Sequence, residues 1–427
     1  MHYGLVAIGS RGDVQPFISL ALGLIDTGHK VTIVAHENFK EFVESYDLQF
    51  KPLFGNVEEV LHSPEGKKAL NSGSSIAMLK YIEKIGRKTQ KQINQDILKG
   101  CEEAEVIVSS ALGAAWVYSI AEKTGKKWAI VQLSFPVTPT TEFPFAGMDY
   151  FNFPRFNLFT YRMLLKVYWK FNRYQINEFR NSLGLTVLTE SIIKKIEEKQ
   201  ILTLYCVSPT LIPRPKDWSE NVKVTGFLTP PFKSREKNNL EKIPEALQNW
   251  IKNGEKPIYI GFGSMPVPNV EKFNKILSEL VSRGNHRFIF CYGWSGVPDL
   301  VASPNLYSLP YINHEWLFPQ CKVAIIHGGV GTTAAVLKAG IPVIVLSVFG
   351  DQPWWGKLIE RRKLGIHMPF KKMTRQNLVN AIDQTQTPEI LTNAKQIGTQ
   401  INNEDGLKLT IDALANYFNL TLSQKNN

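Results

Sequence analysis

The chain has little of what marks a metal site, a disulfide framework or a membrane span. Its four cysteines lie far apart and form no Cys-x-x-Cys pair; they are Cys101, Cys206, Cys291 and Cys321. We therefore expect small buried thiols, and neither disulfides nor a zinc site. No apolar run is long enough to cross a bilayer. Asp-x-Asp and Asp-x-Glu pairs are also absent, which removes the acidic pair that often holds a divalent ion on a diphosphate.

Positive charge is in excess, but it is not concentrated. The chain has 49 Lys and Arg against 38 Asp and Glu, for a net charge of +11. The basic residues are dispersed, and the sequence shows no basic recognition helix, RNA-binding motif or zinc finger, so we expect no nucleic-acid partner. The excess predicts only a general attraction to anionic surfaces, and peripheral contact with an anionic membrane stays open.

The length indicates more than one domain. A chain of 427 residues with 44% hydrophobic content can bury large cores, and two or three domains are typical of this size. The first apolar run begins at Tyr3, which leaves no room for a signal peptide, so we expect a cytoplasmic protein. The sequence does not indicate an oligomeric state.

The apolar runs divide the chain into two α/β halves. The first half opens with a strand over 3–8, a helix near 17–27 and a strand over 30–35, which together form a βαβ unit. Further strands are expected at 106–110, 128–132, 203–208, 257–264, 287–293 and 323–327. Proline and charged residues become frequent after residue 208, as in a linker. The predicted organisation is an N-terminal domain over 1–212, a linker over 213–242, a C-terminal domain over 243–403 and a final segment over 404–427 with a helix at 407–418.

The segment from His327 to Gln352 carries the clearest functional signal. It reads as a strand end, a glycine loop, a helix over 332–339 and a second strand. The start of such a helix leaves the N–H groups of Gly331, Thr332 and Thr333 unpaired, and glycine lets a ligand approach them closely, so we predict an anion site. A tight strand-to-helix turn without a ligand would also favour glycine. The residues assigned to the anion site are His327, Gly329, Gly331, Thr332 and Thr333, with Ser264 of the Gly-Phe-Gly-Ser turn.

An acid and an amide follow the next strand. Asp351 and Gln352 should share a crevice with the anion site, because the carboxyl ends of parallel strands meet at one edge of a sheet. Side by side, the two side chains can bind adjacent hydroxyl groups. The alternative is that Asp351 caps the turn before Pro353 and that Gln352 faces solvent.

The loop from Gly9 to Pro16 is the second informative segment. It leaves a strand end and enters a helix, so Ser10 and Asp13 should face a cleft between the two halves. Two interpretations of Asp13 remain open. It is placed to N-cap the helix, with Pro16 tolerated in the first turn, and it is also placed to act as a catalytic carboxylate.

These segments resemble family-1 glycosyltransferases with the GT-B fold, in particular the branch of sterol 3β-glucosyltransferases and glycopeptide-antibiotic glycosyltransferases. The matching stretches are HGGVGTTAAVLKAGIPVIVLSVFGDQ and GSRGDVQP. The resemblance implies an α/β protein with two Rossmann-like parallel-sheet domains that face each other across a cleft. It implies that His327 and the Gly-Thr-Thr turn hold a nucleotide diphosphate, and that Asp351 and Gln352 hold the donor sugar. Ser10 and Arg11 would lie in the acceptor-side loop.

The chemistry implied is attack of an acceptor hydroxyl on the anomeric carbon of a nucleotide sugar. Asp13 would take the hydroxyl proton, because plant members use a histidine in this loop and this chain has none there. A single displacement predicts inversion, and the missing acidic pair predicts metal-independent catalysis. In the resembling enzymes the Asp-Gln pair accompanies UDP-glucose, which serves as a co-substrate, so we expect this donor, no cofactor and no metal.

Recognition of the base and of the acceptor is less constrained. The segment 311–320 resembles the family's base-binding segment, which would give Tyr311, Asn313 and His314 contacts with base and ribose. Tyr311 is equally readable as a core or interface aromatic, and we favour that reading for Trp316. Aromatic and basic residues alternate over 151–185, which indicates an apolar acceptor pocket, a surface for anionic lipid, or simply one buried and one solvated helix face. A hydrophobic hydroxylated acceptor is implied mainly by the resemblance.

Two other classes of protein are alternatives. A nucleotide-dependent oxidoreductase would use the first βαβ unit with Glu37 near a ribose, but the loop lacks Gly-x-Gly-x-x-Gly spacing and this reading leaves 327–352 unexplained. A catalytically silent sugar or lipid binder would keep the C-terminal site without the base, and Asp13 argues weakly against it.

Overall fold

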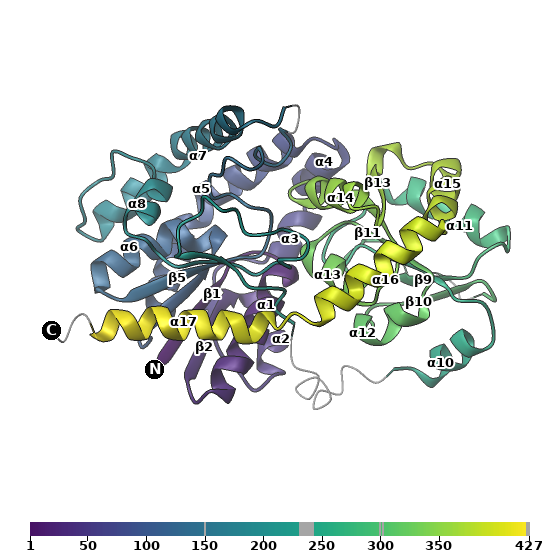
Figure 1. Cartoon of the computed structure of the whole chain (residues 1–427), viewed down its shortest axis with the longest axis horizontal. Coiled ribbons are helices and arrows are strands. Elements are labelled where there is room, and N and C mark those ends of the chain that lie inside the picture. Colours follow the sequence, from purple (N-terminus) through teal and green to yellow (C-terminus); the bar gives the residue numbers. More distant parts are fainter. Residues whose placement is uncertain (149–150, 230–242, 299, 301–302, 424–427) are drawn as a thin grey trace. The chain divides into compact units, whose positions relative to one another are not determined.

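The computed structural model describes residues 1–148, 151–229, 243–298, 300 and 303–423 (Figure 1). They form two compact units. The first unit comprises Met1–Val57, Lys84–Arg235 and Glu404–Asn427, and the second comprises Glu58–Glu83 and Glu236–Asn403. Glu58–Glu83 lies within the range expected for the N-terminal domain, yet it groups with the second unit. Positions 230–242 of the expected linker lie outside the described residues.

The first unit is built on a seven-stranded parallel sheet of order β3-β2-β1-β4-β5-β6-β7. All six residues of β1 are buried, as is typical of a parallel strand covered on both faces. The edge strand β3 contains Pro52 and is largely exposed, which is where a strand tolerates proline. The strands are β1 (His2–Ala7), β2 (Lys30–His36), β3 (Gln49–Leu53), β4 (Val106–Ser110), β5 (Lys127–Gln132), β6 (Thr203–Tyr205) and β7 (Val222–Val224).

Helices cover the first sheet and close the unit. They are α1 (Arg11–Asp26), α2 (Lys40–Glu44), α6 (Ala114–Thr124), α7 (Pro154–Ser182), α8 (Ile192–Glu198) and α17 (Gly406–Ser423), while α5 (Ser75–Gly100) crosses the border between the units. Short 3₁₀ turns follow β2 and β4 at Glu37–Phe39 and Ala111–Gly113. The last helix, α17, packs on α1 (Figure 1). Gly23 permits this contact, because a Cβ there would come within 2.6 Å of Ile411 Cδ1.

The second unit is built on a six-stranded parallel sheet of order β10-β9-β8-β11-β12-β13. Its strands are β8 (Ile258–Gly261), β9 (Phe288–Cys291), β10 (Leu306–Leu309), β11 (Val323–Ile326), β12 (Val343–Ser347) and β13 (Gly365–Pro369). Its helices are α3 (Val57–His62), α4 (Pro64–Asn71), α10 (Glu245–Lys252), α11 (Val270–Ser282), α12 (His314–Leu317), α13 (Val330–Lys338), α14 (Gln352–Arg361), α15 (Arg375–Thr385) and α16 (Pro388–Asn402), with 3₁₀ turns at Phe318–Gln320 and Phe370–Lys372.

The predicted α/β class with two parallel sheets is confirmed, and several boundaries differ. The first helix begins at Arg11 instead of near residue 17, because Ser10 supplies the N-cap. Pro16 therefore lies in the second turn, where it removes one backbone donor. The helix expected at 332–339 spans Val330–Lys338 and ends before Gly340, whose φ is +68°. All four cysteines are buried free thiols, as expected.

Candidate functional site

The candidate residues of each unit lie at the carboxyl edge of its own sheet. In the second sheet, β9 and β10 are added on one side of β8, and β11 and the later strands on the other, so the order of strands switches between β8 and β11. In the first sheet, the order switches in the same way between β1 and β4. Ligands of open α/β sheets bind at such switch points. The loop after β8 carries Ser264, and the loop after β11 carries His327. The loop after β1 carries Ser10 and Asp13.

His327 is buried between two glycine loops. Its ring lies against Gly329 of its own loop, and a Cβ on Gly263 would stand 3.4 Å from its Cε1. Gly263 has a φ of +57°, so the turn after β8 needs glycine for its backbone as well as for this contact. Burial lowers the pKa of His327 to about 4, so the imidazole is neutral at pH 7. Its Nδ1 is buried without a hydrogen-bond partner among the described residues.

The start of α13 presents backbone donors beside this ring. Helix geometry leaves the N–H groups of Val330, Gly331 and Thr332 without intrahelical acceptors. A Cβ on Gly331 would meet open space, so the backbone is accessible there. The prediction that the Thr333 N–H is unpaired is wrong. Both the N–H and the hydroxyl of Thr333 donate to the Gly329 carbonyl at 2.9 Å, since the helix begins two residues earlier than expected.

Asp351 is held by a tryptophan in its own helix. It occupies the N-cap position of α14, but its carboxylate accepts a hydrogen bond from Trp355 Nε1 at 3.1 Å instead of capping the backbone. Burial raises the pKa of Asp351 to about 6, against the lowering effect of the Trp355 hydrogen bond. The carboxyl group is therefore costly to ionise, as is common at functional sites.

Gln352 is buried, and the alternative in which it faces solvent is wrong. Its Oε1 accepts hydrogen bonds from the backbone N–H groups of Val348 at 2.8 Å and Phe349 at 3.2 Å. The amide oxygen thus shapes the loop between β12 and α14. Within the described ranges Nε2 has no hydrogen-bond partner, so the NH₂ group is the part of this side chain that can serve a ligand.

The segment after β10 places its polar side chains in structural contacts. Asn313 Oδ1 caps α12 by accepting from the N–H of Glu315 at 2.8 Å. His314 stacks on Phe318 at 4.5 Å between ring centroids, and its Nε2 lies 3.0 Å from the Tyr259 hydroxyl. Tyr311 is 52% exposed, so its ring is accessible to a base. Trp316 is partly buried.

In the first unit, Asp13 completes a capping box and is not the N-cap itself. Its Oδ2 accepts hydrogen bonds from the Ser10 N–H at 2.8 Å and from the Ser10 hydroxyl at 3.2 Å. Gly9 has a φ of +135°, and a Cβ there would collide with the Asp13 carboxylate. Arg11 stacks on Phe42, with its guanidinium carbon 4.3 Å from the ring centroid. Asp13 is only partly buried, so a structural role and a role toward a ligand are compatible.

Sequence reasoning missed a histidine that supports the glycine turn of the second unit. His62, at the end of α3, lies with its Nε2 2.9 Å from the carbonyl oxygen of Trp294. The N–H of Trp294 in turn donates to the Gly263 carbonyl at 3.0 Å. This chain of contacts connects the segment 58–83 to the turn beside His327. Nothing in the local pattern signalled it, because His62 and Trp294 are 232 positions apart.

A loop at the carboxyl edge of the first sheet was missed as well. After β5, the N–H groups of Val137 and Thr138 donate to the Tyr205 hydroxyl at 3.0 and 2.9 Å. Asp217 accepts from the Thr140 hydroxyl at 2.7 Å and from the Thr141 N–H at 2.6 Å. The Pro- and Thr-rich composition of 133–144 was the available signal, since such runs mark ordered loops as readily as flexible ones.

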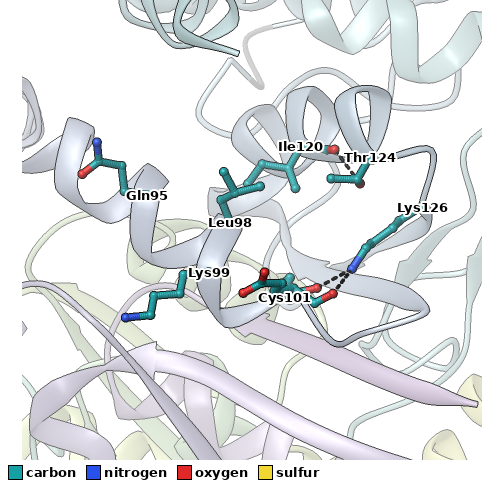
Figure 2. A pocket seen from close by; sticks show the side chains of 8 residues that line it. Gln95, Leu98, Lys99, Cys101, Ile120, Thr124 and Lys126 are labelled. Atoms are coloured by element: carbon teal, nitrogen blue, oxygen red, sulfur yellow. Dashed lines mark hydrogen bonds between the residues drawn. The ribbon is translucent and has the colours of Figure 1, made fainter.

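A cavity of about 460 Å³ lies away from the candidate residues (Figure 2). It is lined by the ends of α5 and α6, and Lys126 Nζ donates to the carbonyl oxygens of Cys101 at 2.7 Å and Glu102 at 2.5 Å. Lys126 and Glu102 precede strands β5 and β4, so this cavity opens at the amino edge of the sheet. The chemistry of the candidate site lies at the opposite edge.

Two family models match parts of the chain. Residues 3–128 match the glycosyltransferase family 28 N-terminal domain. Residues 294–404 match the erythromycin biosynthesis protein CIII-like C-terminal domain. The first match contains Asp13, and the second contains the residues from Tyr311 to Gln352.

Solved structures show the same fold. The glycosyltransferase of kitacinnamycin has a TM-score of 0.70 at 14% identity, over 97% of this chain and 98% of that one. The calicheamicin glycosyltransferase CalG4 has a TM-score of 0.67 at 12% identity, over 98% of both chains. These likenesses confirm the GT-B class of fold, with its two Rossmann-like domains.

Curated relatives are similar along almost the whole chain. Sterol 3-beta-glucosyltransferase UGT80A2 of Arabidopsis thaliana is 33% identical over 97% of this chain and 65% of its own length. The sterol 3-beta-glucosyltransferase of Komagataella phaffii is 32% identical over 96% of this chain and 34% of its own length. The chain thus spans about two thirds of the plant relative and about a third of the yeast one. Since it is also 31% identical to sterol 3-beta-glucosyltransferase UGT80B1 of Arabidopsis thaliana over 67% of that protein, the chain belongs to the sterol 3-beta-glucosyltransferase family of glycosyltransferases.

Proposed function

We propose that this protein transfers a hexose from a nucleotide sugar to a hydroxyl group of a hydrophobic small molecule or lipid. UDP-glucose is the proposed donor and a sterol-like alcohol the proposed class of acceptor, in line with the names of the plant and yeast relatives. The observation that carries the proposal is the start of α13 beside His327, because it combines backbone donors with a buried ring nitrogen that no described residue satisfies.

The diphosphate would bind at this helix start. Its charge would be stabilised by the dipole of α13 and by the N–H groups of Gly331 and Thr332, with Ser264 on the neighbouring turn. His327 would contribute a hydrogen bond from a neutral ring and not a positive charge, since burial holds its pKa at about 4. Departure of the diphosphate requires no metal ion in this scheme, because the helix dipole and the backbone N–H groups stabilise its negative charge in place of a cation.

Asp13 is the proposed base. The acceptor oxygen attacks the anomeric carbon, the bond from that carbon to the diphosphate oxygen breaks, and the acceptor proton passes to the carboxylate. The products are the glycoside and the nucleoside diphosphate. One displacement inverts the configuration at the anomeric carbon.

The sugar would be read by Asp351 and Gln352. The carboxylate would accept hydrogen bonds from sugar hydroxyls, and the Gln352 NH₂ group would donate one. A site that depends on such bonds discriminates strongly against a sugar whose hydroxyl is missing or inverted. We therefore propose that UDP-glucose is preferred over UDP-galactose.

The test of the base is Asp13→Asn. Asparagine keeps an oxygen for the Ser10 N–H, so the helix cap survives while proton transfer is lost. We expect turnover to fall about 10²- to 10⁴-fold with UDP affinity unchanged. Ser10→Ala, which removes one hydrogen bond to the carboxylate and keeps the base, is the matched control and should lose much less. A folded Asp13→Asn protein with near wild-type turnover would reduce Asp13 to a capping residue.

A thermal-shift experiment separates this function from the two alternatives. UDP and UDP-glucose should raise the melting temperature and NADPH should not. A shift with NADPH alone would indicate an oxidoreductase. Binding of UDP-glucose together with the absence of glycoside formation from any sterol, terpenoid or flavonoid alcohol would indicate a silent binder.

A further inference from the structure

The outer face of α7 exposes a continuous row of apolar side chains. Phe159, Met163, Val167, Phe171 and Tyr174 follow one another at steps of four, four, four and three residues and are 57%, 37%, 44%, 56% and 75% exposed. At about 100° per residue they fall within about 120° of the helix circumference. We call these five residues the α7 stripe. Phe151 and Phe153, just before the helix, are 62% and 51% exposed and extend the apolar surface.

The charge along the α7 stripe is positive as far as its last residue, and exposed Glu178 follows one turn after Tyr174 on the same face. From residue 151 to residue 177 the sequence contains no Asp or Glu. Five basic residues in this range are exposed; on the helical wheel four of them flank one side of the stripe, and the fifth, Lys170, falls just inside that edge. The five are Arg155, Arg162, Lys166, Lys170 and Arg173. An apolar row bordered by Lys and Arg is typical of helices that lie in the interface of an anionic bilayer.

The opposite face of α7 fixes the helix so that the stripe faces outward. Tyr161 and Ile176 are fully buried, and Phe179 packs edge-on against Trp116 of α6 at 6.3 Å between ring centroids. Arg180 is buried and donates to Glu122 Oε1 at 2.7 Å. Rolling the helix to hide the stripe would break this ion pair and expose the buried aromatic residues. The exposed row is therefore a property of the folded unit.

We propose that the α7 stripe docks on the surface of an anionic lipid bilayer, with the aromatic side chains inserted at the headgroup level and the basic residues against lipid phosphates. This goes beyond the proposed transfer reaction and does not depend on the donor. None of the described helices is long and apolar enough to cross a membrane. Docking in the plane of the interface is the mode that an amphipathic helix of this kind supports.

Charge favours a bilayer over a second copy of the chain. Two copies facing each other through α7 would bring ten like charges together at one interface, and like-charge juxtaposition opposes association. An anionic leaflet instead attracts every one of the five basic residues. The apolar row alone would fit either partner, so the charge decides between them.

The test is co-sedimentation of the full chain with phosphatidylcholine vesicles, with and without phosphatidylserine, in the absence of donor and acceptor. We expect binding only when phosphatidylserine is present, and weaker binding at high salt. Replacing three of these five charges, in Arg162→Gln, Lys166→Gln and Lys170→Gln together, should lower the partition coefficient roughly 100-fold. Replacing Phe159→Ser and Phe171→Ser together should abolish binding.

Matched controls use exposed residues of other helices and turns. Lys371→Gln, Lys372→Gln and Lys395→Gln remove the same charge, and Leu391→Ser and Leu409→Ser remove the same number of exposed apolar side chains. Both control variants should bind like the wild type. The proposal is overturned if the wild type stays in the supernatant with phosphatidylserine vesicles, or if the α7 variants and the controls bind equally. It is also overturned if light scattering shows that the wild type is a dimer that binds no vesicles, and that the variant with Phe159→Ser and Phe171→Ser is a monomer.

Discussion

Replacing Asp351 by asparagine should stabilise the folded protein at neutral pH while it harms sugar transfer. Burial raises the pKa of this carboxyl group from 3.8 to about 6, so the folded state holds its proton over a pH range in which the unfolded chain has lost it. Stability therefore falls as the pH rises from about 4 to about 6, and the loss is complete above that range. Asparagine never ionises and so avoids this loss.

The magnitude follows from the two pKa values. The gap between 3.8 and about 6 corresponds to about 3 kcal/mol at about 1.4 kcal/mol per pH unit. Asparagine retains an oxygen that can accept the hydrogen bond from Trp355 Nε1, so little is lost in exchange. At roughly 2–4 °C per kcal/mol for a domain of this size, the melting temperature at pH 8 should rise by roughly 6–12 °C.

The assay compares the thermal and urea unfolding of wild type and Asp351→Asn between pH 4 and pH 8. The difference in stability should be near zero at pH 4 and grow until about pH 6.5. Asp26→Asn, at the exposed end of α1, corrects for the loss of one negative charge from the chain. A difference that does not change with pH would refute the argument, and so would an Asp351→Asn protein that is no more stable than the wild type at pH 8.

Three further predictions concern the proposed donor site. Initial rates should be indifferent to EDTA and need no added Mg²⁺ or Mn²⁺; a loss of activity on chelation that metal restores would show that the diphosphate is neutralised by a cation. Gln352→Glu keeps the oxygen for the Val348 and Phe349 N–H groups and removes the NH₂ donor, so it should reduce glucosyl transfer at least 10-fold with UDP binding little affected. An unchanged preference for UDP-glucose over UDP-galactose would exclude Gln352 as a sugar ligand. His62→Ala should raise the KM for the donor about 5-fold through the Trp294 and Gly263 contacts, and a fall in kcat with unchanged KM would contradict a positioning role.

The parts of the fold that could be predicted are those encoded by local patterns. Buried parallel strands such as 106–110 have continuous apolar runs, and the predicted bounds of β4 match the structure. The short edge strands β7 and β10 and the proline-containing β3 have no such run, because an edge strand is defined by its neighbour and not by its own composition. Helix starts were misplaced wherever the cap was misassigned, as at Ser10 and Gly329.

The candidate site shows the same division. The positions of His327 and Asp351 after buried strands could be predicted, because continuous apolar runs indicate these strands and the end of each run marks the end of its strand. The protonation states of the two groups could not, since they arise from burial by residues distant in sequence. The hydrogen bonds of Thr333 and Gln352 could not be predicted either. Both were expected to bind a ligand because of their positions, but both form hydrogen bonds with nearby backbone groups. The Thr333 hydroxyl donates to the Gly329 carbonyl, and Gln352 Oε1 accepts from the N–H groups of Val348 and Phe349.

These internal bonds suggest how the proposed ligands are held in position before substrate binds. The oxygen of Gln352 orders the loop before α14, the Asp13 carboxylate orders the loop before α1, and Trp355 orients Asp351. In each case a polar atom of the proposed ligand is bonded within the scaffold, and the NH₂ group of Gln352 remains for substrate. A group fixed in this way loses little conformational entropy when substrate binds, and its dipole already points in a set direction. Substitutions such as Asp13→Asn and Gln352→Glu, which keep the bonded oxygen and change the chemistry of the side-chain group, consequently separate chemistry from folding, and alanine at the same positions does not.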